Sequence, residues 1–309
     1  MLEPPPEVAD ADLRTEVCRA WDPDVDRVSH LAVGFGAHHW AAYAGAERIL
    51  FVTYDRRARP GDAFGELEAA YDGAMTLRDR GLEFVIAPLR GRHRRVLVPF
   101  ADGALSCTPW RDGTSEGPLD LPWTLDALRR LHGAAPPAGL VRWRPKVAPD
   151  LAETLSSSTR RVWGPGPYAD DARAGVAGHL VDIARWTARY HHLADVARSR
   201  PWVATHGEPH SDNQLLTADG RFLIDWDTLR LAPAEVDLRV LVENGARPDE
   251  VGADRQMLEL FDLEWRLDEI NQYAAWFAAP HTGSRDDEIA FGGLLHELER
   301  AGQAANSDG

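Results

Sequence analysis

The most constraining feature of this chain is the stretch from Thr205 to Asp227, THGEPHSDNQLLTADGRFLIDWD. It reads as a loop, a short strand, the turn Ala-Asp-Gly and a second strand that ends at Asp225. Because the strands of a hairpin lie side by side, Asp225 is expected to return beside the loop that carries Glu208 and Asn213. Carboxylate and amide oxygens from two close segments are the hard ligands that a divalent cation needs. The stretch therefore predicts a cation site at Asn213 and Asp225.

Local patterns divide the chain into a mixed part and a helical part. The first part reads as strands at 28–35, 40–45, 48–55, 82–89 and 94–110, with one amphipathic helix at 62–81. From residue 120 the helical period dominates, as in 169–199 and 261–280. A length of 309 residues is more than one compact core usually holds. The sequence thus predicts an α+β fold of two lobes.

Composition narrows the class of partner. The chain is 44% hydrophobic and 27% charged, as soluble globular proteins are, and its formal net charge is -15. Such a surface repels nucleic acid and anionic membranes and favours cationic small molecules. No run of apolar residues is long enough to span a membrane, and the acidic, proline-rich start differs from a signal peptide. Cys18 and Cys107 are expected to be reduced, and the protein to be cytoplasmic.

The loop at Glu208 has the spacing of a kinase catalytic loop. Kinases need a residue that accepts the proton of the substrate hydroxyl, followed by an asparagine and an acid that hold metal ions on the phosphates. Four residues separate Glu208 from Asn213, as they separate the kinase Asp and Asn. The runs HGEPHSDN, LIDWD and APAEVDL together resemble the aminoglycoside phosphotransferase family of antibiotic kinases, which is related to choline and homoserine kinases. That family usually has His-Gly-Asp-x-His-x-x-Asn, so Glu208 stands at its aspartate.

This resemblance implies a protein-kinase-like fold with a small β-rich lobe and a larger, mainly helical lobe. The nucleotide-binding lobe would span 1–105, the hinge 106–113 and the helical lobe 114–309. The implied cofactor is Mg2+, and the implied phosphoryl donor is ATP or GTP. The expected partner is a small-molecule acceptor, with the chain a monomer or a homodimer and without nucleic acid or membrane partners.

The resemblance also implies a role for each motif residue. Glu208 would be the catalytic base, and Asn213 and Asp225 would be the metal ligands. His206 and Asp237 are expected to be structural and to hold the loop together.

Glutamate in place of aspartate raises the question of whether the loop is active. Glu208 keeps the carboxylate and its proton affinity. The extra methylene adds a reach of about 1.3 Å, and a displacement of about 1 Å can cost on the order of a hundredfold in rate. Pro209 restricts the backbone of Glu208 to extended conformations, so the loop can be set for the longer side chain. Because both metal ligands are present, we interpret Glu208 as a variant base.

Two segments are predicted to contact the nucleotide. Gly34, Phe35 and Gly36 lie between two expected strands, where kinases place a glycine-rich cover over the phosphates. Cys107, in ALSCTPW, lies at the expected lobe junction, where the backbone of related kinases binds the nucleotide base.

The third strand lacks the lysine that kinases place there to pair with the phosphates and a helix glutamate. Thr53 occupies the matching position, and the single lysine of the chain is Lys146. Either Arg56 or Arg57 would reach into the site, or the site would depend more on metal and backbone. The glutamates expected to pair with such a lysine are Glu66 and Glu68.

Glu264 and Asp268 are the predicted acceptor-binding residues. They lie one turn apart on a late helix, where this family usually binds its acceptor, and they could attract a cationic aminocyclitol. The favoured acceptor is an antibiotic of the aminoglycoside or aminocyclitol type, which would make the protein a resistance enzyme. A metabolite kinase for a choline-, homoserine- or nucleoside-like acceptor would use the same residues. A catalytically silent nucleotide-binding module is the third alternative.

Overall fold

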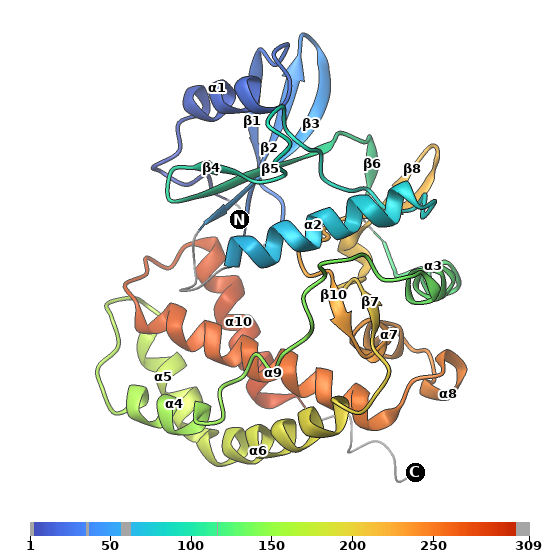
Figure 1. Cartoon of the computed structure of the whole chain (residues 1–309). Coiled ribbons are helices and arrows are strands. Elements are labelled where there is room, and N and C mark those ends of the chain that lie inside the picture. Colours follow the sequence, from blue (N-terminus) through green and yellow to red (C-terminus); the bar gives the residue numbers. More distant parts are fainter. Residues whose placement is uncertain (1–2, 35–36, 57–62, 116, 301–309) are drawn as a thin grey trace. The chain divides into compact units, whose positions relative to one another are not determined.

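The computed structural model describes residues 3–34, 37–56, 63–115 and 117–300 (Figure 1). The fold divides into two compact units. Unit 1 comprises Met1–Arg142 and Trp202–Gly245, and unit 2 comprises Trp143–Pro201 and Ala246–Gly309. Unit 1 thus contains both the N-terminal sheet and the stretch from Thr205 to Asp227. The lobe boundaries expected from the sequence stay a prediction.

A five-stranded antiparallel sheet forms the N-terminal part of unit 1, in the order β1-β2-β3-β5-β4. Its longest strand, β3, alternates between buried side chains such as Val52 and Tyr54 and more open ones such as Thr53. Helix α1 covers the face of Val52 and Tyr54, where Leu13 and Val17 enter the same core cluster. The strands are β1 Arg27–Leu31, β2 His38–Ala44, β3 Glu47–Arg56, β4 Val98–Phe100 and β5 Gly103–Pro109. The helices are α1 Asp10–Ala20 and α2 Ala63–Asp79.

The rest of unit 1 consists of two small sheets and two helices. One sheet has the order β6-β8-β9, and the other pairs β10 with β7. Strands β8 and β9 form the hairpin predicted from the sequence, with Gln214 opposite Leu223. The strands are β6 Gly113–Thr114, β7 Val203–Thr205, β8 Gln214–Thr217, β9 Gly220–Leu223 and β10 Arg230–Ala232. The helices are α3 Leu121–Gly133, the short 3-10 helix η1 Ser211–Asn213 and α7 Glu235–Glu243.

Unit 2 is helical and is built around α9. Asp254 caps this helix, because its carboxylate accepts hydrogen bonds from the N–H groups of Gln256 and Met257. One face of α9 is apolar and buried, as its period predicted, and includes Leu267 and Ile270. The helices are α4 Leu151–Thr159, α5 Ala169–Gly178, α6 Leu180–Ala197, α8 Pro248–Val251, α9 Arg255–Ala278 and α10 Arg285–Glu299.

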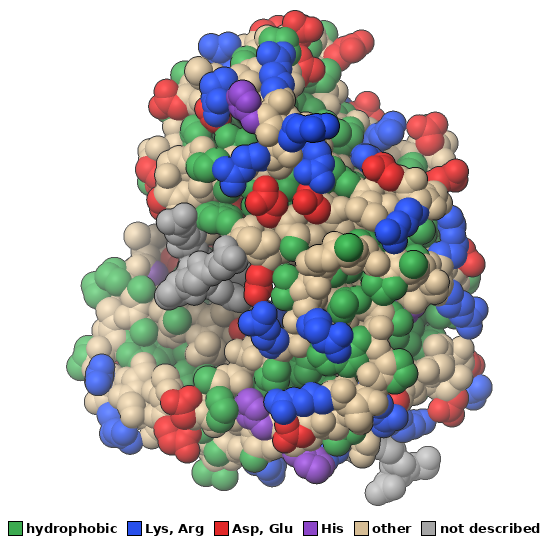
Figure 2. Space-filling view, in the orientation of Figure 1, with side chains coloured by type: hydrophobic (Ala, Val, Ile, Leu, Met, Phe, Trp, Pro, Cys, Tyr) green, Lys and Arg blue, Asp and Glu red, His purple; other side chains and the backbone are tan. Residues whose placement is uncertain are grey.

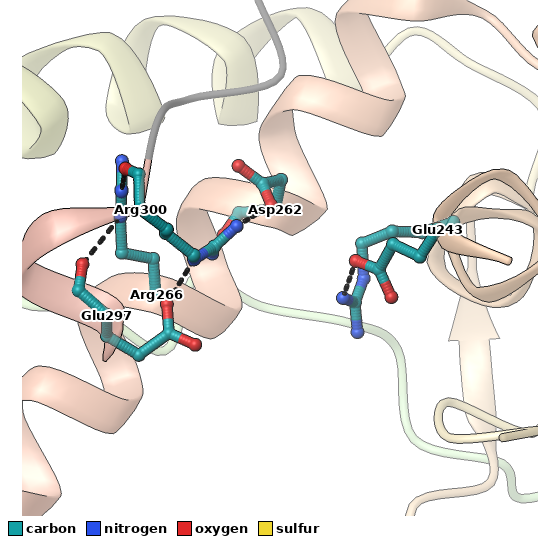
Figure 3. A network of polar contacts seen from close by, with 6 residues as sticks. Glu243, Asp262, Arg266, Glu297 and Arg300 are labelled. Carbon is teal, nitrogen blue, oxygen red and sulfur yellow. Dashed lines mark hydrogen bonds and ion pairs between the residues drawn. The ribbon is translucent and has the colours of Figure 1, made fainter. Parts of the chain in front are cut away.

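Buried ion pairs join the end of α10 to α9 (Figure 3). Arg300 contacts Asp262 at 2.5 Å and also pairs with Glu297, and both carboxylates are almost completely buried. Arg266 donates its Nε–H to the carbonyl of Glu297 at 2.9 Å, and its guanidinium lies 4.1 Å from the Trp186 ring. The bond from Arg266 satisfies the carbonyl of Glu297, which lies in the last turn of α10, where carbonyls lack partners within the helix.

Charged side chains of both signs are interspersed over the face drawn in Figure 2. The described residues form several surface ion pairs, such as Arg48 with Asp112 at 2.8 Å and Arg185 with Asp182 at 2.7 Å. Pairs of this kind contribute little to stability. Within the described residues, no helix is long and apolar enough to cross a membrane.

The predicted fold class is confirmed, with an antiparallel sheet in the N-terminal region and helices in the C-terminal region. Three predicted elements were wrong. Segment 94–110 is not one strand, because a turn at Ala101 and Asp102 divides it into the antiparallel pair β4 and β5. Segment 82–89 is not a strand, because only Val85 forms a bridge there, to Leu223. The long helix expected over 169–199 is two helices, and α5 ends at Gly178.

Candidate active site

A buried aspartate holds the backbone of the catalytic loop, which we define as residues 206–213. Asp237, near the start of α7, is fully buried. Its Oδ1 accepts from the N–H of Gly207 at 2.6 Å, and its Oδ2 accepts from the N–H of His206 at 3.0 Å. The Nε2 atom of His132 also lies 2.8 Å from this Oδ2. A carboxylate that accepts two consecutive backbone N–H groups fixes their direction. These contacts match the structural role expected for Asp237.

His206 joins the catalytic loop to the hairpin. Burial lowers the pKa of its imidazole, which favours the neutral ring. The Nδ1 atom accepts from the N–H of Glu208 at 3.3 Å, and Nε2 donates to the carbonyl of Ile224 at 2.9 Å. The tautomer with its proton on Nε2 satisfies both contacts. His206 therefore ties the residue before Asp225 to the residue that carries the predicted base.

Gly207 makes the turn that leads to Glu208. Its φ is +100°, a conformation that side chains other than glycine rarely adopt. A Cβ atom at this position would lie 2.6 Å from Oγ1 of Thr228. That hydroxyl already donates to the carbonyl of His206 at 2.5 Å. Both the conformation and the space require glycine here.

Glu208 and Asn213 face each other across the loop. The Nδ2 group of Asn213 donates to the carbonyl of Glu208 at 2.9 Å. This leaves the Oδ1 of Asn213 as the oxygen that could bind a cation. The Oε2 atom of Glu208 lies 3.9 Å from Nε2 of His210, and this Nε2 is 3.3 Å from Nδ2 of Asn213. His210, which sequence reasoning left without a role, thus lies beside both the predicted base and a predicted ligand.

Asp225 follows β9 and lies close to the catalytic loop. Ile224 donates its N–H to the carbonyl of Asn213 at 3.0 Å, which fixes the two segments one residue before Asp225. The φ of Asp225 is +64°, an uncommon value for a residue other than glycine. Solvent reaches its side chain, yet the surrounding protein atoms and the charge of Glu208 raise its pKa to about 6. The structure therefore brings Glu208, Asn213 and Asp225 together within unit 1.

The open face of β3 carries an acid, Asp55, two residues after Thr53, which occupies the position of the kinase lysine. Thr53 and Asp55 alternate with the buried Val52 and Tyr54, so they share the face opposite α1. The hydroxyl of Thr53 lies 3.3 Å from Nδ1 of His39. Burial, and then the charge of Asp225, raise the pKa of Asp55 to about 7. Sequence reasoning missed Asp55, although its position two residues after Thr53 on the same strand placed it on this face.

Helix α2 presents Tyr71, and not a glutamate, to this acid. The hydroxyl of Tyr71 forms a hydrogen bond with the side chain of Ser106. Burial and the charges of Asp55, Asp227 and Asp225 raise the pKa of this phenol well above its ordinary value. Tyr71 thus lies near three carboxylates.

The predicted substitutes for the lysine pair lie elsewhere. Glu66 is exposed, and Glu68 lies 3.9 Å from Arg95. Arg56 pairs with Glu7 and lies 3.8 Å from Asp102, so it does not reach into the site as considered from the sequence. The other candidate, Arg57, lies outside the described residues.

The predicted nucleotide contacts are only partly within the described chain. Gly34 has a φ of +70°, and a Cβ there would lie 3.0 Å from the His39 ring, which again favours glycine. Phe35 and Gly36 lie outside the described residues. Cys107 is a central residue of β5, fully buried in the core cluster, and its carbonyl accepts from the N–H of Leu89 at 2.7 Å. Cys107 thus lies within a strand, and its expected backbone contact with the nucleotide base stays a prediction.

Glu264 belongs to the interior of unit 2. Trp143 donates its indole N–H to both carboxylate oxygens at 2.9 Å, and Tyr190 donates its hydroxyl to Oε2 at 2.6 Å. Only 4% of the residue is exposed. A carboxylate occupied in this way does not meet a ligand, so the predicted acceptor contact of Glu264 is corrected to a structural role.

Asp268 remains accessible in unit 2. It lines a cavity of about 220 Å3 together with Thr154, Asn271 and Lys146. The single lysine of the chain lies here, with its Nζ 3.8 Å from Oδ2 of Asp268. The cavity therefore offers an acid, an amine, an amide and a hydroxyl to a small molecule.

Comparison with known proteins agrees with this geometry. The chain is 29% identical over 260 residues to protein StrN of Streptomyces griseus, an alignment that covers 77% of this chain and 78% of StrN. Its fold is similar to that of spectinomycin phosphotransferase APH(9)-Ia in complex with ADP and spectinomycin. The TM-score is 0.69 at 16% identity, over 93% of this chain and 94% of the other.

Two further folds are similar. Amicoumacin kinase hAmiN, in complex with AMP-PNP, Ca2+ and Ami, has a TM-score of 0.59 at 12% identity, over 94% of this chain and 93% of the other. A choline/ethanolamine kinase family protein from Mesorhizobium loti has a TM-score of 0.54 at 15% identity, over 94% of each chain. The model of the phosphotransferase enzyme family matches residues 56–276, well over half of the sequence. The chain therefore belongs to the phosphotransferase enzyme family, as its motifs predicted, and is a phosphotransferase with an alcohol group as acceptor.

Proposed function

We propose that this protein transfers the γ-phosphoryl group of ATP or GTP to a hydroxyl of a small-molecule antibiotic of the aminoglycoside or aminocyclitol type. The observation that carries the proposal is the convergence of Glu208, Asn213 and Asp225 on one loop and one hairpin of unit 1. This is the arrangement that phosphoryl transfer uses for a proton acceptor and for two metal-binding side chains.

Glu208 orients the acceptor hydroxyl and takes its proton. Asn213 fixes the backbone of this residue through the bond to its carbonyl, and Asp237 fixes the preceding turn. The longer side chain is accommodated because His206 binds the N–H of Glu208 and sets the direction of the loop. Positioning of this kind contributes more to phosphoryl transfer than base catalysis does.

The residues at the site fit a bound Mg2+. Asn213 and Asp225 supply an amide and a carboxylate oxygen, which are hard ligands, from two segments joined by the Ile224 hydrogen bond. When bound, the ion neutralises charge on the phosphates. Among the similar folds, the amicoumacin kinase structure holds AMP-PNP with Ca2+, and the spectinomycin phosphotransferase structure holds ADP.

An antibiotic acceptor is supported by charge and by the relatives. The net charge of -15 favours cationic ligands, and Asp268 presents a carboxylate to a cavity in unit 2. Two proteins of similar fold are a spectinomycin phosphotransferase and an amicoumacin kinase. A metabolite kinase is the second candidate, because the choline/ethanolamine kinase family protein has a similar fold as well.

The test is a screen for magnesium-dependent phosphate transfer, read by mass spectrometry. Purified protein is incubated with ATP or GTP and with aminoglycosides, aminocyclitols, choline or ethanolamine. An antibiotic that gains one phosphate supports the proposal, and phosphorylation of choline or ethanolamine alone supports the second candidate. Nucleotide binding without transfer to any acceptor would instead identify a catalytically silent module.

Variants of the base test its role directly. Glu208→Ala is expected to lose about a hundredfold or more in kcat, as removal of a general base does. Glu208→Asp keeps the carboxylate and is expected to retain much of the activity. Equal rates for wild type and Glu208→Ala would remove Glu208 from the mechanism.

A further inference from the structure

One oxygen of Asp55, the acid on the open face of β3, has no hydrogen-bond partner among the described residues. The Oδ2 atom of Asp55 is buried and accepts no hydrogen bond. No Lys, Arg or His of the described residues forms an ion pair with Asp55 or with Asp225. The charges of these two carboxylates act on each other. Unit 1 therefore contains two carboxylates whose charges repel each other, and His210 offsets part of this repulsion at Asp225 by lowering its pKa.

Two buried carboxylates of the described residues illustrate how this chain supplies donors. Asp237 accepts from two backbone N–H groups, and Glu264 accepts from Trp143 and Tyr190. A buried carboxylate without a donor is unfavourable, and a second negative charge nearby adds to the cost. Oδ1 of Asp286 is also buried without a hydrogen-bond partner, so the distinguishing feature of Asp55 is that the charge of a predicted metal ligand, Asp225, acts on it.

The strand position explains what the acid replaces. In a kinase, the cation of the third-strand lysine meets the phosphates at this face. Here the same face presents a carboxylate from the strand and the neutral Tyr71 from α2. Phosphates entering this site would meet negative charge from both Asp55 and Asp225, unless a cation came with them.

We propose that Asp55 is an additional ligand for the divalent cation that accompanies the nucleotide, together with Asp225, and that this cation replaces the third-strand lysine. The inference rests on the proposed function, since it assumes a nucleotide donor. The described residues include no group of three or more His, Cys, Asp or Glu side chains that could hold a metal alone. The remaining ligands are therefore phosphate oxygens and water, so that metal and nucleotide bind together.

The consequence is an unusually strong coupling between metal and nucleotide. Without metal, Asp55 repels the phosphates, and with metal it helps to bind them. Repulsion without metal raises the Kd of the nucleotide, and coordination with metal lowers it. Both effects therefore increase the ratio of the Kd without metal to the Kd with metal, and this ratio measures the coupling between the two ligands.

The experiment measures that ratio by calorimetry. AMP-PNP is titrated into full-length protein in EDTA and in excess Mg2+, for wild type, for Asp55→Asn and for the exposed control Asp79→Asn. Wild type and Asp79→Asn are expected to bind about a hundredfold more tightly with Mg2+, and Asp55→Asn at most about tenfold. Because Asn has the shape of Asp and Oδ2 of Asp55 accepts no hydrogen bond, this variant is expected to fold.

A second variant gives an opposite and independent result. Asp55→Lys places a cation on the strand, and it is expected to bind AMP-PNP in EDTA at least about tenfold more tightly than wild type. The role of Asp55 would be refuted if Asp55→Asn showed the same ratio of Kd values as wild type, or if Asp55→Lys bound AMP-PNP in EDTA no more tightly than wild type. The kinase assignment would remain intact in either case. If wild type bound no nucleotide in either buffer, the proposed function and the inference would both be wrong.

Discussion

Substitution of Asp237 by Asn should separate the support of the catalytic loop from its chemistry. The carboxylate accepts from Gly207 at 2.6 Å and from His206 at 3.0 Å, and it contacts His132 at 2.8 Å. Asn keeps the size of the side chain but has only one oxygen that can accept hydrogen bonds. Its NH2 group takes the place of the other oxygen and then faces an N–H donor, with which it cannot form a hydrogen bond. Asp237→Asn therefore disrupts the pattern without creating a cavity.

The expected loss follows from these contacts. Gly207 can keep its bond to the remaining oxygen, and His132 can accept from the new amide through its other tautomer. The N–H of His206 is then left buried without a partner, which costs about 1–3 kcal/mol, and lost charge assistance adds about 1 kcal/mol. Asp237→Asn should thus lose about 2–4 kcal/mol of unfolding free energy, a large part of the 5–15 kcal/mol typical of a domain.

Urea denaturation followed by tryptophan fluorescence measures this loss. The control is Asp79→Asn, because Asp79 is exposed and its ion pair with Arg78 is expected to contribute less than about 0.5 kcal/mol. In phosphate-transfer assays below its melting temperature, Asp237→Asn should also lose kcat, since the turn before Glu208 is no longer fixed. Stability within about 0.5 kcal/mol of wild type would refute our account of the loop.

Two further predictions concern charge. Asp55 has a pKa of about 7 when folded and 3.8 as the ordinary value, so its favourable effect is complete below pH 3.8 and lost as pH rises through 7. In EDTA, the stability of Asp55→Asn relative to wild type should therefore increase by about 2–3 kcal/mol between pH 5 and pH 8 in urea titrations, and an unchanged difference would contradict the burial of this acid. Arg300→Met should destabilise the protein by about 3–5 kcal/mol in thermal denaturation, because it leaves the buried Asp262 and Glu297 unpaired (Figure 3). The control is Arg198→Met, whose partner Asp195 is exposed, and it should cost less than about 0.5 kcal/mol. Similar losses for the two arginine variants would show that the buried network adds nothing.

The part of the site that could be predicted from the sequence is the part that is local. Glu208, Asn213 and Asp225 lie within one loop and one hairpin, so their separation along the chain nearly fixes their separation in space. Turn signals and a short apolar strand were sufficient to place them. Asp55 is different, because its distance from Asp225 depends on how the five-stranded sheet and α2 lie against the hairpin. No spacing in the sequence contains that information.

The wrong expectations have a common physical cause. Segment 82–89 is apolar because it is buried, yet its backbone bonds to Leu223 through Ile86 and Phe84 form only one bridge. An apolar run records burial and not backbone conformation. In the same way, Glu264 has the spacing of a solvated helix face, but Trp143, from a distant segment, covers it. A pattern cannot identify the partner that makes burial of a charge acceptable.

The inverted charge on β3 also bears on whether the site is active. A site that had lost its chemistry would be free to replace unfavourable acids by neutral residues, since a buried carboxylate without a donor lowers stability. Asp55 has kept that cost, in a unit where Asp237 shows that the chain can satisfy a buried acid fully. Costly local features persist when a bound ligand compensates them. Under the metal role proposed for Asp55, the absence of the lysine and the presence of the acid have one explanation, because the metal supplies the cation that the strand lacks. On this view the glutamate at position 208 acts in a site adapted to its metal and is no sign of decay.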